Sequence, residues 1–294
     1  MKQKAFTQHH FTTLGSEKSG AGFTLIEILV VLAIIGLIIS VIFINLKGAR
    51  EKAKLARTFQ FYQSVNHALG AYIVGAWSFN TIDGSTVLDL SGYGNNGTIQ
   101  GNPQRVDGLS ALGKALSFDG NDYVNIPDNY RLDNTNKLTI EFWVYPTFLD
   151  GQARGVISKR VNVNNQQSYS IFFFTNNRLY FDINGNTNRF STNASFGKNT
   201  WYYVVLIYDG TLSSSQRVKV FIDSSLDKIS SEGSASIPDY VSDLTIGILD
   251  AGDSRAFVGM IDEVKIYNEA LAVAEIQKHY AEGMEGHKNL ALGE

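Results

Sequence analysis

The hydrophobic pattern divides the 294-residue chain into an apolar run, an amphipathic stretch and a long alternating region. No residue from Ile28 to Leu46 is charged, and this length approaches the ~20 residues that a helix needs to cross a bilayer core. From Lys47 to Gly70 apolar residues recur every three or four positions, at Leu55, Phe59, Tyr62, Val65 and Leu69. The pattern predicts one helix from Phe23 to Gly70. Its first half, about residues 24–46, is expected to span the membrane, and its amphipathic half is expected to pack on the C-terminal domain.

Beyond residue 74 the pattern changes to β-branched or alternating segments separated by Asn, Gly, Asp and Ser. Turn signals every 8–12 residues or so predict an all-β jelly-roll sandwich over residues 75–283. The expected strands are Val87–Leu90, Ala115–Phe118, Tyr123–Ile126, Leu138–Tyr145, Gly155–Lys159, Tyr169–Phe174, Arg178–Ile183, Trp201–Tyr208, Val218–Ile222, Leu244–Ile248 and Phe257–Tyr267. A short C-terminal helix is expected over Asn268–Glu282, followed by a flexible tail, 284–294. The three tryptophans lie within strand patterns and are expected to pack in the core: Trp77, Trp143 and Trp201.

The six residues from Gly22 to Glu27, Gly-Phe-Thr-Leu-Ile-Glu, precede the apolar run. An acid at the edge of such a run is costly unless a cation pairs with it. The segment resembles the cleavage and methylation site of type IV pilins and of type II secretion pseudopilins. The resemblance implies that a prepilin peptidase removes a leader, residues 1–22, by cutting after Gly22, and then methylates Phe23. It also implies that Glu27 pairs with the terminal ammonium of a neighbouring subunit during assembly. A plain signal anchor is the alternative.

Four passages between Gly75 and Gly283 resemble the laminin-G-like, concanavalin-A-like jelly rolls. They are Ala76–Phe79, Asp89–Gly97, Ala115–Val124 and Gly259–Tyr267, in this order. The resemblance supports the sandwich fold. It implies a sugar- or protein-binding module, although fold alone leaves function open.

The same passages contain candidate ligands for a metal. In a strand from Phe257 to Tyr267, Asp262 shares a face with the apolar residues at even positions, so we expect a core-facing carboxylate that needs a partner. The loop Asp89–Gly97 offers a carboxylate, amide oxygens and glycines, which suit a hard cation. Members of the resembled family often hold structural calcium, and Asp89, Asn95 and Asp262 are the expected Ca²⁺ ligands. The alternative is a hydrogen-bonded Asp262 beside a plain Asn-Gly turn.

The composition gives little support for catalysis or for nucleic-acid binding. The net charge of −3 argues against a nucleic-acid partner, and the chain has no cysteine. Its histidines lie in the leader, the first helix, the final helix and the tail, at positions 9, 10, 67, 279 and 287, so a Ser–His–Asp site has little to draw on. Glycosidases on this fold carry paired acids a few residues apart on one strand. Asp262 and Glu263 are adjacent instead, so their side chains face opposite sides of the strand. We therefore expect no enzyme.

Three loop residues are the candidate ligand contacts: Tyr93, Tyr130 and Asn164. Together these features predict a pilin-like filament subunit, either a minor pilin or a pilus-associated adhesin, whose jelly roll binds glycans or surfaces. The alternative is a pseudopilin of a type II secretion system whose sandwich caps the filament or recognises cargo. Either role implies the prepilin peptidase, other subunits and the bacterial inner membrane as partners. The chain is expected to cross that membrane once, with its C-terminal domain outside the cytoplasm, before it enters a filament.

Overall fold

The computed structural model describes residues 25–35, 37, 73–109, 113–133, 136–161, 167–183, 189–251 and 254–290. The chain divides into two compact units, Met1–Lys54 and Leu55–Glu294. In the first unit residues 25–35 and 37 are helical, and large apolar side chains on this helix are exposed, Leu25 by 83% and Leu32 by 63%. None of the helices among the described residues has the length and apolar character needed to cross a membrane. The leader and most of the predicted helix from Phe23 to Gly70 lie outside the described residues.

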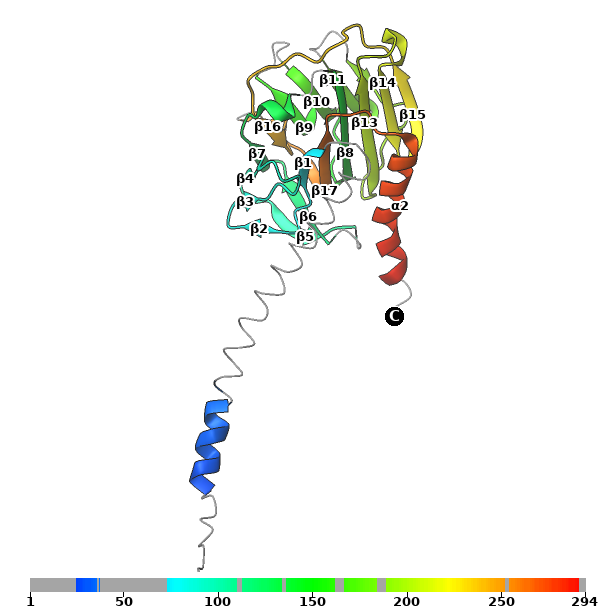
Figure 1. The fold of residues 1–294 in the computed structure, drawn as a ribbon. Helices are drawn as coiled ribbons and strands as arrows, with labels where there is room; N and C mark the ends of the chain where they lie inside the picture. The colour runs from blue at the N-terminus through cyan, green and yellow to red at the C-terminus, as the bar shows by residue number, and fades with distance from the viewer. Residues whose placement is uncertain are drawn as a thin grey trace, which may run out of the picture. The chain divides into compact units, whose positions relative to one another are not determined.

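The second unit is a sandwich of two antiparallel sheets (Figure 1). One sheet has eight strands in the order β15-β14-β13-β8-β17-β6-β5, and β1 pairs with β17. The strands of this sheet are β1 (Ile73–Trp77), β5 (Gln104–Asp107), β6 (Lys114–Asp119), β8 (Lys137–Pro146), β13 (Tyr202–Asp209), β14 (Val218–Ile222), β15 (Ser225–Ser230) and β17 (Val258–Tyr267). Strand β17 therefore lies beside both β1 and β8, so the two ends of the domain meet at the middle of the sheet.

The other sheet has nine strands in the order β12-β11-β10-β9-β16-β7-β4-β3-β2. They are β2 (Ile82–Asp83), β3 (Thr86–Val87), β4 (Gly97–Gln100), β7 (Tyr123–Ile126), β9 (Arg154–Arg160), β10 (Gln167–Phe173), β11 (Leu179–Ile183), β12 (Phe190–Ser191) and β16 (Leu244–Ile246). The described residues of this unit also form the 3₁₀ turns η1 (Tyr130–Leu132), η2 (Thr175–Asn177) and η4 (Ser214–Gln216). The sandwich predicted from the sequence is confirmed.

The main core lies between the two sheets. Alternating residues of facing strands fill it, among them Phe142 of β8 and Ile171 of β10, which are fully buried. Trp77 is also fully buried in this core, as its strand pattern predicted. Burial of this apolar surface is the main force that holds the sheets together, at ~25 cal/mol for each Å² removed from water.

A second apolar cluster joins the outer face of the eight-stranded sheet to the C-terminal helix α2 (Val273–Leu290). Trp143 of β8 stacks on Tyr280 of the helix, with ring centroids 5.7 Å apart, and Ile276 is fully buried beneath the helix. Ile276 and Tyr280 therefore lie on the side of the helix that packs on the sheet. The helix begins later than predicted, because residues 268–272 first cross the end of the sheet, and it continues past Met284 to Leu290.

A bulge in β17 changes which side chains face the core. Asp262 is opposite Trp143 and Lys265 is opposite Glu141, so two residues of β17 fall between these pairs, and Glu263 has a φ of 48°. Ile261 faces the main core before the bulge and Val264 faces it afterwards. The prediction that Asp262 shares the core face with the even positions is therefore wrong, because an extra residue reverses the alternation. Asp262 is buried on the outer face, on the side of Trp143.

Candidate functional site

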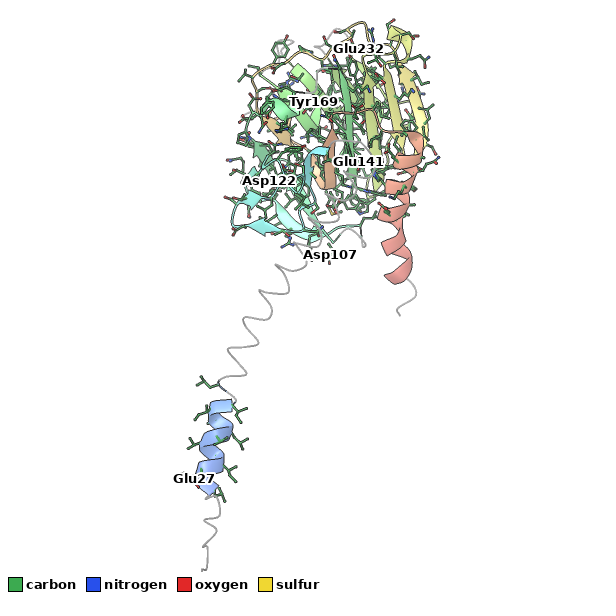
Figure 2. The ribbon with its side chains drawn as sticks, in the orientation of Figure 1. Glu27, Asp107, Asp122, Glu141, Tyr169 and Glu232 are labelled. Carbon is green, nitrogen blue, oxygen red and sulfur yellow. The ribbon has the colours of Figure 1, made fainter. Side chains whose placement is uncertain are left out.

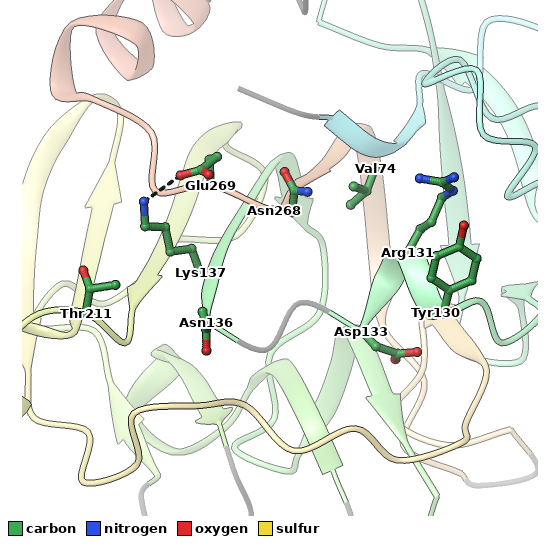
Figure 3. A pocket seen from close by; sticks show the side chains of 9 residues that line it. All are labelled: Val74, Tyr130, Arg131, Asp133, Asn136, Lys137, Thr211, Asn268 and Glu269. Carbon is green, nitrogen blue, oxygen red and sulfur yellow. Dashed lines mark hydrogen bonds and ion pairs between the residues drawn. The ribbon is translucent and has the colours of Figure 1, made fainter. Parts of the chain in front are cut away.

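A polar pocket of about 470 Å³ opens at one end of the sandwich. Loops and strand ends that are distant in the sequence form it: η1, the start of β8, the turn after β13 and the segment after β17. The lining residues are Val74, Tyr130, Arg131, Asp133, Asn136, Lys137, Thr211, Asn268 and Glu269 (Figure 3). Figure 3 shows Tyr130 and Arg131 on one side of the opening and Lys137, Thr211 and Glu269 on the other.

The loop from Asp89 to Gly97 is folded around the carboxylate of Asp89. Oδ1 accepts hydrogen bonds from the backbone N–H groups of Ala76 (3.0 Å) and Ser91 (2.9 Å). Oδ2 accepts from the Ser91 hydroxyl (2.7 Å) and the Asn95 backbone N–H (2.8 Å). The Asn95 amide donates to the Val74 carbonyl at 2.7 Å, which ties the loop to β1. Asp89 is only 4% exposed, so these four bonds replace the water that the carboxylate has lost.

This loop presents Tyr93 beside the pocket. Gly92 and Gly94 on either side of it have φ angles of 89° and 77°, which side-chain-bearing residues rarely adopt, so the turn requires glycine at both positions. The guanidinium carbon of Arg131 lies 4.3 Å from the ring centroid of Tyr93 and 5.0 Å from that of Tyr130. Two of the predicted ligand contacts, Tyr93 and Tyr130, are thus brought together by an arginine that the sequence did not single out.

Turn η1 fixes the backbone of this cluster. The side chain of Asn129 caps the turn by accepting a hydrogen bond from the Arg131 backbone N–H at 3.0 Å. Tyr130 is 72% exposed, so its ring is a platform at the rim of the pocket. Among the described residues, the Arg131 guanidinium has no carboxylate within ion-pair distance and no hydrogen-bond acceptor.

An ion pair forms the opposite wall. Lys137 Nζ donates to Glu269 Oε2 at 2.8 Å, and this bond raises the pKa of Lys137. The Thr139 hydroxyl donates to the Glu269 carbonyl at 2.6 Å and accepts from the Leu271 N–H at 3.1 Å. These bonds hold the segment after β17 against the start of β8, so this side of the pocket is fixed to the eight-stranded sheet.

A second carboxylate that lines the pocket, Asp133, lies close to a buried lysine. Asp133 Oδ1 lies 2.8 Å from Nζ of Lys159, whose side chain is fully buried. The same ammonium donates to Asp128 at 2.6 Å and to the Ser242 carbonyl at 2.8 Å. Burial raises the pKa of Asp133, although Lys159 opposes the shift. The two carboxylates lining the pocket, Asp133 and Glu269, thus each have a lysine partner.

The three expected calcium ligands differ in their hydrogen bonds. The four hydrogen bonds to Asp89 already occupy the acceptor sites that a carboxylate offers, so Asp89 fits a cation poorly. Asn95 Oδ1 and Asp262 Oδ2 are buried without a hydrogen-bond partner among the described residues. Burial raises the pKa of Asp262 well above its usual value, and the nearby Glu263 adds to this effect. No group of three or more His, Cys, Asp or Glu in the described parts of the chain is placed to hold a metal. Calcium binding stays a prediction.

A buried polar cluster lies away from the pocket, beneath α2. Glu141 of β8, which is labelled in Figure 2, belongs to this cluster. Its exposed fraction is 1%. It accepts hydrogen bonds from the hydroxyls of Tyr203 (2.7 Å) and Tyr267 (2.8 Å), and His279 Nδ1 lies 2.9 Å from it. Lys265 Nζ is 3.3 Å away. Burial alone would raise the pKa of Glu141, but Lys265, His279 and Tyr203 outweigh it and hold the pKa well below its usual range. This cluster anchors the C-terminal helix.

The remaining predicted site residues lie away from the pocket in the sequence or outside the described residues. Glu27 is on the described helix, with its side chain exposed. Gly22, Phe23 and Asn164 lie outside the described residues, so their assignments stay predictions. Two of the pocket residues that the sequence did not reveal are Lys137 and Glu269, which are 132 positions apart and are ordinary charged residues in a linear reading. Only the sheet topology brings them together.

Two family models match the chain. The model described as the concanavalin A-like lectin/glucanases superfamily (Laminin_G_3) matches residues 118–277, and the model of the prokaryotic N-terminal methylation motif matches residues 18–43. Both resemblances noted in the sequence are therefore confirmed. A search of the curated proteins gives no match.

Solved structures share the fold at low sequence identity. Domain 4 of AbnA, a GH43 extracellular arabinanase from Geobacillus stearothermophilus in complex with arabinotriose, has 21% identity and a TM-score of 0.55, covering 71% of this chain and 98% of that domain. Trypanosoma rangeli sialidase in complex with sialic acid has 17% identity and a TM-score of 0.54, covering 71% and 32%. A structure of botulinum neurotoxin type C, whose cell entry depends upon interaction with two ganglioside molecules, has 17% identity and a TM-score of 0.55, covering 72% and 51%. These likenesses show the fold.

Proposed function

This chain belongs to the concanavalin A-like lectin/glucanases superfamily, and from this membership and its N-terminal methylation motif we propose that it is a pilin-like filament subunit that binds glycans. In this role a prepilin peptidase cleaves after Gly22, the N-terminal helix enters the membrane and then a filament, and the sandwich is displayed outside the cytoplasm as a minor pilin or a pilus-associated adhesin. The motif supports the filament role. The exposed apolar side chains of the helix, such as Leu25 and Leu32, also support it, because such a surface needs lipid or other subunits to cover it.

The proposed binding site is the pocket that Tyr130 and Arg131 line, with Tyr93 next to it. A saccharide has apolar ring faces and many hydroxyls, and this pocket offers an exposed aromatic ring next to amide, hydroxyl and charged groups. The arabinanase domain is seen with arabinotriose and the neurotoxin interacts with gangliosides, which supports a saccharide as the class of ligand.

Binding without cleavage is part of the proposal. Glycosidases use one carboxylic acid to protonate the leaving group and a second carboxylate as base or nucleophile. Here Asp133 and Glu269 are each held by a lysine ammonium at 2.8 Å. Neither is available as an unpaired base, so bound saccharides should be recovered intact.

A glycan array probed with the full chain in detergent tests the binding role. We expect the wild type to bind a defined set of saccharides, and Tyr130→Ala to weaken that binding roughly threefold to tenfold, since a lost aromatic contact is worth ~0.5–1.5 kcal/mol. Phe148→Ala is the matched control, because Phe148 is also exposed and also lies under an arginine, 5.1 Å from Arg154, but does not line the pocket. No binding by the wild type, or equal loss in both variants, would contradict the proposal.

A further inference from the structure

We propose that the pocket selects acidic saccharides, and that Arg131 determines this selectivity by binding the oxyanion group of the sugar, a carboxylate or a sulfate ester. The inference rests on the proposed function, since it names the class of glycan that the same site takes. It depends on three observations: the ion pairs of the residues that line the pocket, the environment of the Arg131 guanidinium, and the contrast between Arg131 and other arginines that contact aromatic rings.

Most of the charged groups that line the pocket have an ion-pair partner within the protein. Four ionisable side chains other than tyrosine line it: Arg131, Asp133, Lys137 and Glu269. Lys137 pairs with Glu269 at 2.8 Å, and Asp133 pairs with Lys159 at 2.8 Å. Within the described part of the chain, Arg131 has no such partner. A ligand with a negative group would give the Arg131 guanidinium the ion-pair partner that the described residues do not supply.

The environment of Arg131 favours an oxyanion with two oxygens that can each accept a hydrogen bond. Its guanidinium carbon lies over the rings of Tyr93 and Tyr130, at 4.3 and 5.0 Å from their centroids. Such contacts hold the cation in place and limit its rotation without using its N–H groups. These N–H groups form a flat fork that matches a carboxylate through two parallel hydrogen bonds. The exposed ring of Tyr130 lies beside the fork, where it can contact the sugar that carries the carboxylate.

The other arginines that contact aromatic rings are neutralised within the protein. Arg154 lies over Phe148 and pairs with Asp150 at 2.7 Å. Arg189 lies over Phe172 and pairs with Asp182 at 2.8 Å. Among the described residues, Arg131 is the arginine of this kind that lines a pocket and has no acidic partner. Arg154 and Arg189 therefore each have an aspartate partner, whereas none of the described acidic residues pairs with Arg131 at the pocket.

Binding measurements on the full chain in detergent, at low salt, test the inference with three probes: trigalacturonic acid, a sulfated galactan trisaccharide and neutral galactotriose. We expect the wild type to bind at least one acidic probe ten or more times tighter than the neutral one, with a preference that weakens as salt is added. Arg131→Gln should weaken binding of the acidic probe tenfold or more and so remove the preference over galactotriose. Arg131→Lys should keep only part of it, because an ammonium lacks the planar fork. Arg154→Gln is the matched control and should keep the preference.

The outcomes separate this inference from the proposed function. Equal affinity of the wild type for acidic and neutral probes, or a preference that survives Arg131→Gln, would overturn the acidic selectivity and leave saccharide binding in place. Binding of no saccharide by the wild type would overturn both. Preference for the carboxylate or for the sulfate probe would identify which of the two oxyanions the site takes, and either result supports the role of Arg131.

Discussion

Asp89 is a single buried residue whose hydrogen bonds shape the loop beside the pocket. Its four bonds shape the loop that presents Tyr93, and Tyr93 in turn contacts Arg131. We expect Asp89→Ala to lower the free energy of unfolding by ~3 kcal/mol, because buried N–H groups of Ala76 and Asn95 lose their acceptor. Urea unfolding of the full chain in detergent measures this loss. Asp119→Ala is the control, since Asp119 is exposed and its side chain accepts one hydrogen bond, from Asn121.

The same variant separates a scaffold role of Asp89 from the predicted role as a calcium ligand. Hydrogen bonds do not depend on calcium, so the loss should be equal in excess Ca²⁺ and in excess chelator, and chelator should not lower the melting temperature of the wild type. A bound metal would stabilise the wild type alone by ~2.7 kcal/mol at a hundredfold excess over its Kd. A loss of stability seen only with calcium present would establish Asp89 as a ligand instead.

For single residues, the sequence predicted which side chains lie in loops or are buried better than it predicted which side chains contact each other. Tyr93 and Tyr130 were identified as loop aromatics, and the structure places both at one site. Arg131 could not be recognised, because what distinguishes it is the absence of an acidic partner among the described residues, and pairing is a property of the folded chain. The burial of Asp262 was predicted correctly, but its face was not, since one bulge reverses every side chain beyond it.

The C-terminal helix is held to the sheet by apolar packing and by the buried Glu141. The pKa of Glu141 in the folded chain lies below its unfolded value, so the stability it contributes is fully present above pH ~4.3 and is lost as the pH falls below that value. We expect Glu141→Gln to lower the free energy of unfolding by ~3 kcal/mol at pH 7, because the variant removes a buried carboxylate that accepts hydrogen bonds from Tyr203 and Tyr267. Lys265 loses one of its carboxylate partners and keeps Glu263 at 3.3 Å. The difference between wild type and variant should shrink when urea unfolding is repeated at pH 3.

Glu282→Gln on the same helix is the control for this measurement. Its carboxylate is 3.7 Å from Lys278 and nearly half exposed, and exposed pairs contribute little to stability. It should therefore resemble the wild type at both values of pH. A difference for Glu141→Gln that is the same at pH 3 and pH 7 would show that the charge of Glu141 does not stabilise the helix contact.

The strength of the local pattern decided which elements the sequence revealed. Strands β7 and β14 have the predicted bounds, because apolar residues alternate cleanly along them. Strands β5, with the sequence QRVD, and β15, with SLDKIS, were missed, since they are short and largely polar. They form at the edges of their sheet through hydrogen bonds to a neighbour, and this tertiary support leaves no periodic signal in the sequence.

The two parts of the molecule differ in how far their apolar side chains are exposed to solvent. The sandwich buries its apolar residues, whereas the described N-terminal helix exposes large apolar side chains, Ile26 by 70% and Leu32 by 63%. The sequence predicted both parts because each has a strong signal, the six-residue motif before the apolar run and the four passages of the jelly roll. The pocket had no such signal, since its lining comes from segments as far apart as Val74 and Glu269.

Glu27 provides the test of filament assembly. An acid at the start of an apolar helix is costly in lipid and is favoured in a filament only if it meets a cation, such as the new terminus of a neighbouring subunit. We expect Glu27→Leu to be cleaved at Gly22 and to remain in the membrane fraction, while its share in sheared filaments falls roughly tenfold or more, as a loss of ~1.4 kcal/mol per contact implies. Glu51→Leu, which removes an acid outside the motif, should assemble as the wild type does. Intact mass gives processing, and immunoblots of membrane and filament fractions give assembly. Incorporation of Glu27→Leu at the wild-type level would exclude a pairing role for Glu27 and leave the methylation motif as a processing signal alone.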